Sequence, residues 1–346
     1  MRRPNRADPA TERDPGADAP SGSRGDEFAL IERLRRRFET GVPAPPGAEE
    51  GIGPRGTLDI EVGIGDDAAV LGLGANERLV VSVDLVAEDV HFDLGVGTPA
   101  DAGWKALAVA LSDLAAMGAT PRFAVVAVAS PPDRDLDDFG QGLAEAAAAF
   151  RCPVVGGDLS RAGALVASVT VAGSLPNDGR PALTRSGARV GDLLFLTGPL
   201  GASAAGLRQL RAGTTATPES ATSIRAYLRP QPRIAEGLAA RRGQATAAID
   251  ISDGLAADAG HLAEASGVGL SFDGLPVAEG ARLEEAIGGG EDYELLLAAP
   301  DGGSLRSAFL EAGLPPPLVV GACTGEVGTC RLEGRPLDRA GWRHQF

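Results

Sequence analysis

The most constraining feature of this chain is residues 101–118 (DAGWKALAVALSDLAAMG), which have helical spacing and are apolar on two opposite sides. The first apolar stripe comprises Trp104, Leu107, Leu111 and Leu114. Asp113 follows Trp104 by nine positions, so at about 100° per residue it points the other way. That other side is otherwise formed by Ala106, Ala110 and Met117. We therefore expect a helix buried on both sides, with a carboxylate that needs a partner. The alternative is that Asp113 forms a local ion pair or lies at an edge.

The segments around this helix predict two blocks of alternating strands and helices. In the first block, strand-like segments fill 58–95 and 123–130, and a helix is expected over 136–150. In the second block, strands are expected at LLFLTG, AAIDIS and GVGLSF, with helices from Ala202, up to about 242 and over 254–266. This pattern is typical of a mixed α/β fold with two domains. We predict a disordered tail (1–25), an N-terminal ATP- and Mg²⁺-binding domain (26–175) and a C-terminal domain (176–346). Residues 28–38 also have helical spacing, and 41–56 predict a Pro/Gly-rich loop.

Composition excludes several classes of partner. The formal net charge is −15, from 47 acidic and 32 basic residues, which argues against nucleic acid or an anionic membrane. No apolar run has the length of a membrane span, and residues 1–25 lack the apolar centre of a signal peptide. The three cysteines show no CxxC spacing. We therefore expect a soluble protein of the reducing cytoplasm.

Aspartates recur at the ends of apolar strands. Side chains alternate along a strand, so Ser82 and Asp84 of LVVSVD share one face, as do Asp250 and Ser252 of AIDISDG. Asp253 then precedes a helix, and the alternative is that Ser252 or Asp253 only caps that helix. Two strands that each carry a serine and an aspartate on one face favour a site.

Two further motifs place aspartates beside glycines. GIGDDAAVL (63–71) contains Asp67, and VVGGDLSR (154–161) contains Asp158. Each motif alone is also typical of simple turn chemistry. The same holds for TGPLGASAAGL (197–207), which either presents backbone N–H groups to an anion or is only a tight turn, and for GGGEDYELLL (288–297). The repetition of the motif indicates a common site.

So many carboxylates require cations. No cluster of histidine and cysteine suits zinc, and oxygen-only ligands favour Mg²⁺. The chain has a single lysine, Lys105, which fits neither a Walker A loop nor the protein-kinase signature. The residues therefore indicate Mg²⁺-dependent phosphoryl transfer in which metal ions hold the nucleotide.

The ordered motifs resemble one known family, the thiamine-monophosphate kinases of the aminoimidazole ribonucleotide synthetase-like superfamily. The resemblance runs from about residue 28 to the C-terminus. It is carried by GIGDDAAVL, VSVDLVAEDVHF, KALAVALSDLAAMGATP, VVGGDLSR, ALTRSGARVGD, LTGPLGASAAGL, AIDISDGLAADAGHLAEASGVG and GGEDYELLL. Selenophosphate synthetase of the same superfamily would need a reactive Cys/Lys pair early in the chain, which is missing before residue 105.

The resemblance implies a homodimer, several Mg²⁺ ions and direct transfer of the ATP γ-phosphate to thiamine monophosphate. By motif, the implied metal ligands are Asp67, Ser82, Val83, Asp84, Asp113, Asp158, Asp250 and Asp253, and the implied catalytic residues among them are Asp84, Asp113 and Asp250. The implied ATP contacts are Gly157, Asp158, Arg185 and Ser252. The implied substrate contacts are His91, Glu291 and Trp342, and the alternative for Trp342 is a core anchor.

Two features depart from the family pattern. Val83 stands where threonine is frequent, which is harmless if that contact uses the backbone carbonyl, and the segments 1–25 and 41–56 are longer than expected. Two other functions remain open from the residues: another ATP-dependent synthetase of the superfamily, and a non-catalytic dimeric binding protein.

Overall fold

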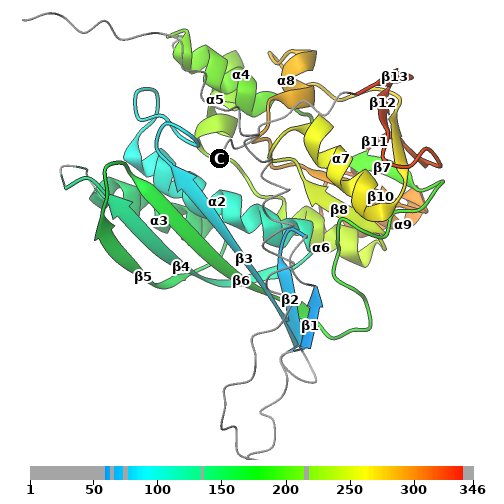
Figure 1. The fold of residues 1–346 in the computed structure, drawn as a ribbon, viewed down its shortest axis with the longest axis horizontal. Coiled ribbons are helices and arrows are strands. Elements are labelled where there is room, and N and C mark those ends of the chain that lie inside the picture. Colours follow the sequence, from blue (N-terminus) through cyan, green and yellow to red (C-terminus); the bar gives the residue numbers. More distant parts are fainter. Residues whose placement is uncertain are drawn as a thin grey trace, which may run out of the picture. The chain divides into compact units, whose positions relative to one another are not determined.

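The computed structural model describes residues 59–62, 66–72, 77–132, 134, 136–213 and 218–337, which all lie in one compact unit. The tail predicted at 1–25, the helix predicted at 28–38, the loop at 41–56 and Trp342 lie outside the described residues. The predicted mixed α/β architecture is confirmed, since helices are interspersed with strands along the chain and the strands form two sheets (Figure 1). In the described part of the chain, no helix combines the length and the apolar character needed to cross a membrane.

The first sheet is built around one long antiparallel pair. In spatial order, the strands described for it are β1 (Asp59–Val62), β2 (Ala69–Gly72), β3 (Glu77–Ala87), β6 (Val166–Pro176), β4 (Thr120–Ser130) and β5 (Val154–Arg161). β3 pairs with β6 along its whole length, from Glu77 opposite Pro176 to Ala87 opposite Val166. The side chains of β3 alternate, so that Val80, Ser82 and Val86 are buried while Val83 and Leu85 are exposed. The polar residues predicted to share a face therefore face the inside of the molecule.

The second sheet follows β6 in the chain. In spatial order, its described strands are β13 (Arg335–Pro336), β12 (Cys330–Leu332), β9 (Gly269–Phe272), β11 (Leu318–Thr324), β7 (Leu193–Leu196), β10 (Leu295–Ala299) and β8 (Ala247–Asp250). The helices of this half are α4 (Ala202–Arg211), α5 (Pro218–Leu228), α6 (Ile234–Arg242), α7 (Leu255–Ser266), α8 (Leu283–Gly288) and α9 (Gly302–Glu311). β10 and β8 are antiparallel, with Leu295 opposite Asp250. Asp250 is thus the last residue of β8, an edge strand that lies beside the buried strand β10.

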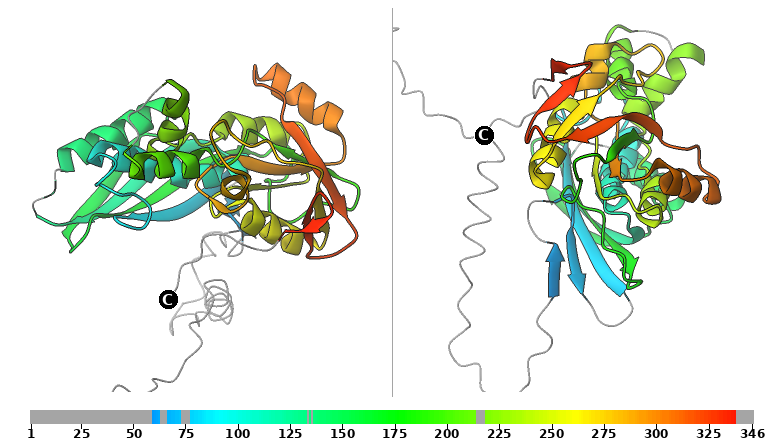
Figure 2. Two further views of the ribbon diagram at one scale, coloured as in Figure 1. Left: turned by 90° about the horizontal axis from the view of Figure 1, so that it is seen from above. Right: turned by 90° about the vertical axis from the view of Figure 1, so that its right-hand side faces the viewer.

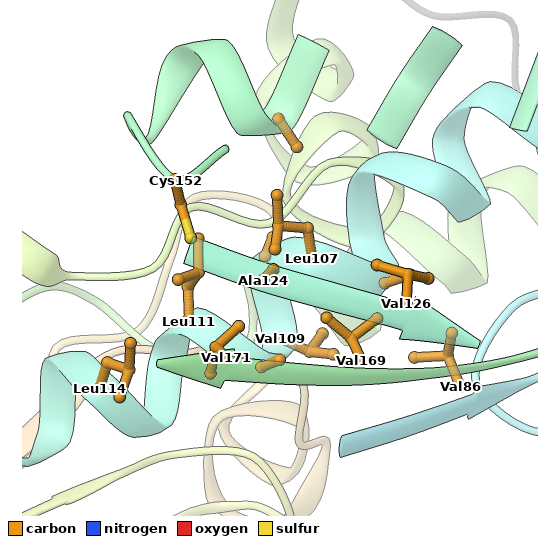
Figure 3. Close-up of a cluster of buried hydrophobic side chains, with 14 of the residues drawn as sticks. Val86, Leu107, Val109, Leu111, Leu114, Ala124, Val126, Cys152, Val169 and Val171 are labelled. Carbon is orange, nitrogen blue, oxygen red and sulfur yellow. The ribbon is translucent and has the colours of Figure 1, made fainter. Parts of the chain in front are cut away.

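The helix α2 (Pro99–Ala116) lies between the two halves. Thr98 and Asp101 form a capping box, and Pro99 occupies the first turn, so local chemistry fixes where the helix begins. One side packs on β3, β6 and β4, with Leu107, Leu111 and Leu114 in the core of the first sheet (Figure 3). The other side contacts α6 and β8. The prediction of a helix buried on both sides is confirmed.

A second helix, α3 (Leu136–Ala149), packs against α2 on the same side of the first sheet (Figure 2, left view). The sequence predicted both helices to within two residues at each end. The motif VVGGDLSR, whose glycines are also typical of a turn, instead forms the strand β5, which continues through Asp158 to Arg161. Backbone pairing with β4 explains the difference, because it extends from Val154 to Arg161 despite the two glycines. The predicted domain boundaries remain a prediction.

The packing of α3 on α2 depends on backbone contact at Gly142. A Cβ atom at Gly142 would lie 1.8 Å from the carbonyl oxygen of Ala100, whereas one at Gly140 in the same helix would meet nothing within 4 Å. We expect Gly142→Ala to lower the free energy of unfolding by about 1–3 kcal/mol through overpacking. Gly140→Ala should raise it by about 0.5–1 kcal/mol through helix propensity. Urea unfolding monitored by circular dichroism measures both, and equal effects of the two substitutions would contradict this account.

Candidate active site

Three aspartates from distant parts of the chain meet beside α2. Asp67 precedes β2, Asp113 lies in α2 and Asp250 ends β8. One carboxylate oxygen of each lies within 4.8 Å of the corresponding oxygens of the other two. The sequence predicted all three as metal ligands, and the fold brings them together. We call Asp67, Asp113 and Asp250 the aspartate cluster.

Two serine hydroxyls orient the aspartate cluster. The Ser82 hydroxyl donates a hydrogen bond to the Asp113 carboxylate, and its Oγ lies 3.2 Å from the carbonyl oxygen of Asp67. The Ser112 hydroxyl donates to Oδ2 of Asp250 at 2.6 Å. A hydroxyl fixes the direction of a carboxylate without neutralising its charge. Ser112 was missed from the sequence, although its position as the polar neighbour of Asp113 in an apolar helix was a usable signal.

Burial and mutual repulsion disfavour ionisation of the cluster. Burial raises the pKa of Asp250 to about 7, and the nearby Asp67 charge adds to this effect. The pKa of Asp113 is also raised well above its usual range. Burial is the main cause, and the charges of Asp250, Asp84 and Asp67 add to it. Two full charges 4.8 Å apart repel by roughly 3–4 kcal/mol at an effective dielectric near 20. Ionisation of all three carboxylates therefore requires positive charge nearby.

Arg185 supplies part of that charge. Its main-chain N–H donates to the Asp66 carboxylate at 3.1 Å, and its guanidinium donates to Oδ1 of Asp67 at 2.5 Å. The pKa of Asp66 is raised to about 6, mainly by burial and then by the charge of Asp67. One guanidinium cannot balance the three carboxylates of the cluster. The arrangement therefore favours further cations beside Asp67.

The donor set fits Mg²⁺. Among the residues that the structure describes, all candidate ligand atoms are oxygens, and Oδ2 of Asp67 is buried without a hydrogen-bond partner. A buried and unsatisfied carboxylate oxygen is costly unless something binds it. Hard divalent cations prefer such oxygens. The aspartate cluster therefore has the chemistry of a site for Mg²⁺.

Asp84 and the turn after β8 lie near the cluster. Asp84 is half-buried on the same face of β3 as Ser82, and its charge contributes to the raised pKa values of Asp113 and Asp250. In the turn, the main-chain N–H of Asp253 donates to the Asp258 carboxylate at 3.1 Å. The Ser252 carbonyl accepts from the main-chain N–H of Glu291 at 2.7 Å. The fold therefore places the GGED segment directly against the turn that carries Ser252 and Asp253.

The fold does not bring Asp158 to the aspartate cluster within one chain. Asp158 is exposed in β5 and pairs with Ala127 of β4. Ala127 in turn pairs with Ser168 of β6, and Ser168 pairs with Leu85 of β3. Three strand spacings of about 4.8 Å separate Asp158 from β3. These paired residues lie on the outer face of the sheet, because Leu85 is exposed whereas Ser82 and Val86, on the opposite face of β3, are buried. Gly157 lies beside it for a packing reason, since a Cβ there would be 2.0 Å from the Val126 carbonyl oxygen.

Val83 also faces away from the cluster. Its side chain is 63% exposed on the outer face of the first sheet. Alternation along β3 explains this, because Ser82 and Asp84 occupy the inner face. A contact from Val83 to a metal would have to use the backbone, and in that case the absence of threonine at this position is harmless.

The two described residues expected to contact the acceptor are joined by Lys105. Its ammonium forms an ion pair with the Glu291 carboxylate at 2.6 Å and donates to the His91 carbonyl oxygen at 2.7 Å. Nδ1 of His91 accepts from the main-chain N–H of Ala87 at 3.1 Å. Glu291 lines a pocket of about 210 Å³, which we call the acceptor pocket. Its lining residues are Ser203, Ala204, Leu207, Arg208, Arg211, Tyr227, Gly289 and Glu291.

Comparisons with known proteins agree with this architecture. Two family models match the chain: the N-terminal domain of AIR synthase related proteins over residues 65–175, and the C-terminal domain of the same proteins over 189–328. The class is therefore that of the AIR synthase related proteins.

The individual relatives are more specific. The thiamine-monophosphate kinase of Salmonella typhimurium is 41% identical over 82% of this chain and 89% of its own length. The crystal structure of the thiamine-monophosphate kinase from Stenotrophomonas maltophilia is 36% identical, with a TM-score of 0.68 over 89% of this chain and 97% of its own. A structure described as AaThiL complexed with AMPPCP and TMP has a TM-score of 0.77 at 30% identity, over 92% and 97% of the two chains. The chain belongs to the thiamine-monophosphate kinase family.

Divalent cations should stabilise the fold through the aspartate cluster. We expect Mg²⁺ to raise the thermal unfolding midpoint of the wild type, because bound metal favours the folded state. Asp250→Asn should abolish this increase, and the exposed Asp273 offers Asp273→Asn as a control that retains it. Differential scanning calorimetry with MgCl₂ and with a chelator measures the shift. An Asp250→Asn variant that responds to Mg²⁺ like the wild type would disprove the assignment.

Without metal, the cluster should make the fold less stable as pH rises. The pKa of Asp250 is raised from 3.8 to about 7, so between these values the unfolded chain has lost a proton that the folded chain keeps. The free energy of unfolding then falls with increasing pH across that window. Urea unfolding in a chelator at a series of pH values measures the slope, and Asp250→Asn should flatten it. A stability that rises steadily from pH 4 to pH 7 with no difference between the two proteins would contradict the prediction.

Proposed function

We propose that this protein transfers the γ-phosphoryl group of ATP to thiamine monophosphate, which gives thiamine diphosphate. The observation that carries the proposal is the aspartate cluster, an oxygen-only site with an unsatisfied buried oxygen, in a chain whose relatives are named thiamine-monophosphate kinases. Support for the two substrates comes from the similar structure described with AMPPCP and TMP.

The proposed mechanism depends on positioning. Asp67, Asp113 and Asp250 would hold Mg²⁺, which when bound supplies positive charge to the phosphate oxygens. The phosphate of the acceptor is already a nucleophile at neutral pH, so no side chain has to act as a general base. The residues of the chain then contribute alignment and charge compensation, which are the main sources of catalysis in phosphoryl transfer.

We propose that the nucleotide lies along the segments that flank the cluster. Arg185 is anchored to Asp66 and Asp67, so its guanidinium is held beside the proposed metal site, where it would add positive charge near the phosphates. Ser252 lies in the turn after β8, next to Asp250. Asp84 and Asp253 are proposed as further metal ligands from the two sides of the cluster, with Ser82 holding Asp113. Gly157 and Asp158 would contribute to the nucleotide from outside this single-chain cluster.

A homodimer would explain the outer face of the first sheet. Val83 and Val125 both pair with Thr170 and therefore share that face, where Leu85 and Phe123 are also exposed. An apolar sheet face of this kind marks an interaction surface. A second copy of the chain is the occupant we propose, and Asp158 lies on the covered face. A cytoplasmic location is also proposed, because the three cysteines are buried and show no CxxC spacing.

The activity test is direct. Purified protein is incubated with ATP, Mg²⁺ and thiamine monophosphate, and the products are separated by chromatography. Formation of thiamine diphosphate supports the proposal. ATP hydrolysis that depends on other acceptors would instead favour another synthetase of the superfamily. The absence of turnover in all combinations would favour a binding protein.

Asp113→Asn should lose most activity while the fold survives. The variant keeps the size of the side chain and its contact with Ser82 but removes one negative charge from the cluster. We expect kcat to fall by about 10²- to 10³-fold, the usual cost of removing one electrostatic contribution to the transition state. Steady-state kinetics and circular dichroism measure the two properties. Near-normal turnover in a folded variant would exclude Asp113 from the metal site.

The position of the proposed dimer interface is tested by substituting two exposed valines. Val125 is 37% exposed on the outer face of the first sheet, and Val327 is 66% exposed in the loop before β12. Val125→Asp should convert the dimer to a monomer, because it buries a charge in the interface, while Val327→Asp should leave the dimer intact. Size-exclusion chromatography with light scattering measures both. A dimeric Val125→Asp protein would move the interface elsewhere.

A further inference from the structure

We infer that Lys105 is a positioning residue for the phosphate acceptor: its buried ammonium fixes the Glu291 carboxylate in the wall of the acceptor pocket and ties it to the His91 turn. The inference rests on the proposed function, because it assigns a role within the site for thiamine monophosphate. It adds a residue that neither touches the reacting phosphates nor belongs to the aspartate cluster.

The ammonium of Lys105 is held by three groups from separate elements. It pairs with Glu291 at 2.6 Å, donates to the His91 carbonyl oxygen at 2.7 Å, and lies 4.3 Å from the centroid of the Tyr227 ring. Lys105 belongs to α2, His91 to the loop before α2, and Tyr227 to α5. A buried ammonium is stable only when charge and hydrogen bonds compensate it. Lys105 therefore joins four segments at one point.

The ion pair is buried on one side and open on the other. The side chain of Lys105 is 2% exposed and that of Glu291 is 25% exposed. Lys105 and Tyr227 also line a cavity of about 10 Å³, the size of roughly one water molecule. Solvent is thus nearly excluded around the ammonium, while Glu291 and Tyr227 face the acceptor pocket. Lys105 supports these two residues from behind.

The backbone at Glu291 needs such support. Its φ is +57°, and that of Tyr293 is +52°, in the left-handed region that non-glycine residues rarely adopt. The main-chain N–H of Glu291 is fixed to the Ser252 carbonyl, and its carboxylate is fixed to Lys105. A strained residue stays in one conformation only when its surroundings hold it. Loss of the ammonium would free the carboxylate and misplace the pocket wall relative to the aspartate cluster.

The wild-type protein permits a test without any substitution. Lys105 is the only lysine of the chain, so growth on lysine labelled with ¹³C at Cε gives one assigned cross-peak. Thiamine monophosphate should shift this peak, because the acceptor contacts Glu291 and Tyr227. ATP with Mg²⁺ alone should leave it in place. A peak that ignores the acceptor, or that responds equally to ATP, would overturn the inference.

Kinetics of Lys105→Met give an independent readout. We expect KM for thiamine monophosphate to rise by about 10- to 100-fold from misplacement of the acceptor, with KM for ATP nearly unchanged. If Lys105 acts through Glu291, the double variant with Glu291→Gln should be no worse than the worse single variant. Unchanged KM for the acceptor, or fully additive effects, would count against the role. If Lys105→Met does not fold, the titration of the labelled wild type decides.

A second buried cation provides the matched control. Arg241 of α6 is buried and pairs with Asp178 at 2.6 Å. Arg241→Met should lower the thermal midpoint without changing KM for the acceptor, so a purely structural loss is recognised. Failure of the proposed function is distinguishable, because the wild type would then form no thiamine diphosphate. If only the inference fails, the wild type still forms thiamine diphosphate, but Lys105→Met shows no selective rise in KM for thiamine monophosphate.

Discussion

Repulsion among buried carboxylates is the constraint on which this site depends. Asp67, Asp113 and Asp250 are brought within 4.8 Å of one another by elements that pack for other reasons, namely the apolar faces of α2, the first sheet and β8. Ser82 and Ser112 orient the carboxylates, and Arg185 offsets part of the charge. The negative charge that Arg185 does not offset favours a bound cation. The apolar core thus holds the aspartates in an arrangement that the cluster alone would not adopt.

Much of this arrangement could be predicted from the sequence because it follows from periodicity. Helical spacing placed Asp113 alone on an apolar side of α2, and strand alternation placed Ser82 and Asp84 on one face of β3. Periodicity says nothing about which strands become neighbours. The motif around Asp158 was therefore grouped with the other aspartates, although β4 and β6 separate β5 from β3.

Other contacts were missed because they depend on tertiary packing. Lys105 looked informative only as the residue that excluded the usual ATP-binding loops. Its partners His91 and Glu291 are far apart in the chain, and only the packing of α2 against the 288–293 segment brings them to one ammonium. Ser112 was overlooked in the same way, since its partner Asp250 belongs to the second sheet.

The position of α2 has a consequence for how such proteins can be divided and recombined. By sequence α2 belongs to the first block, but Ala115 and Ala116 at its end lie in a core cluster with Phe195 and Leu295 of the second sheet. One core cluster is therefore shared between the two blocks, whereas another lies wholly within residues 188–330. A cut between β6 and β7 would therefore expose apolar surface on both fragments, at the end of α2 and on the second sheet. Chimaeras between relatives should accordingly inherit α2 together with the second half that it was matched to.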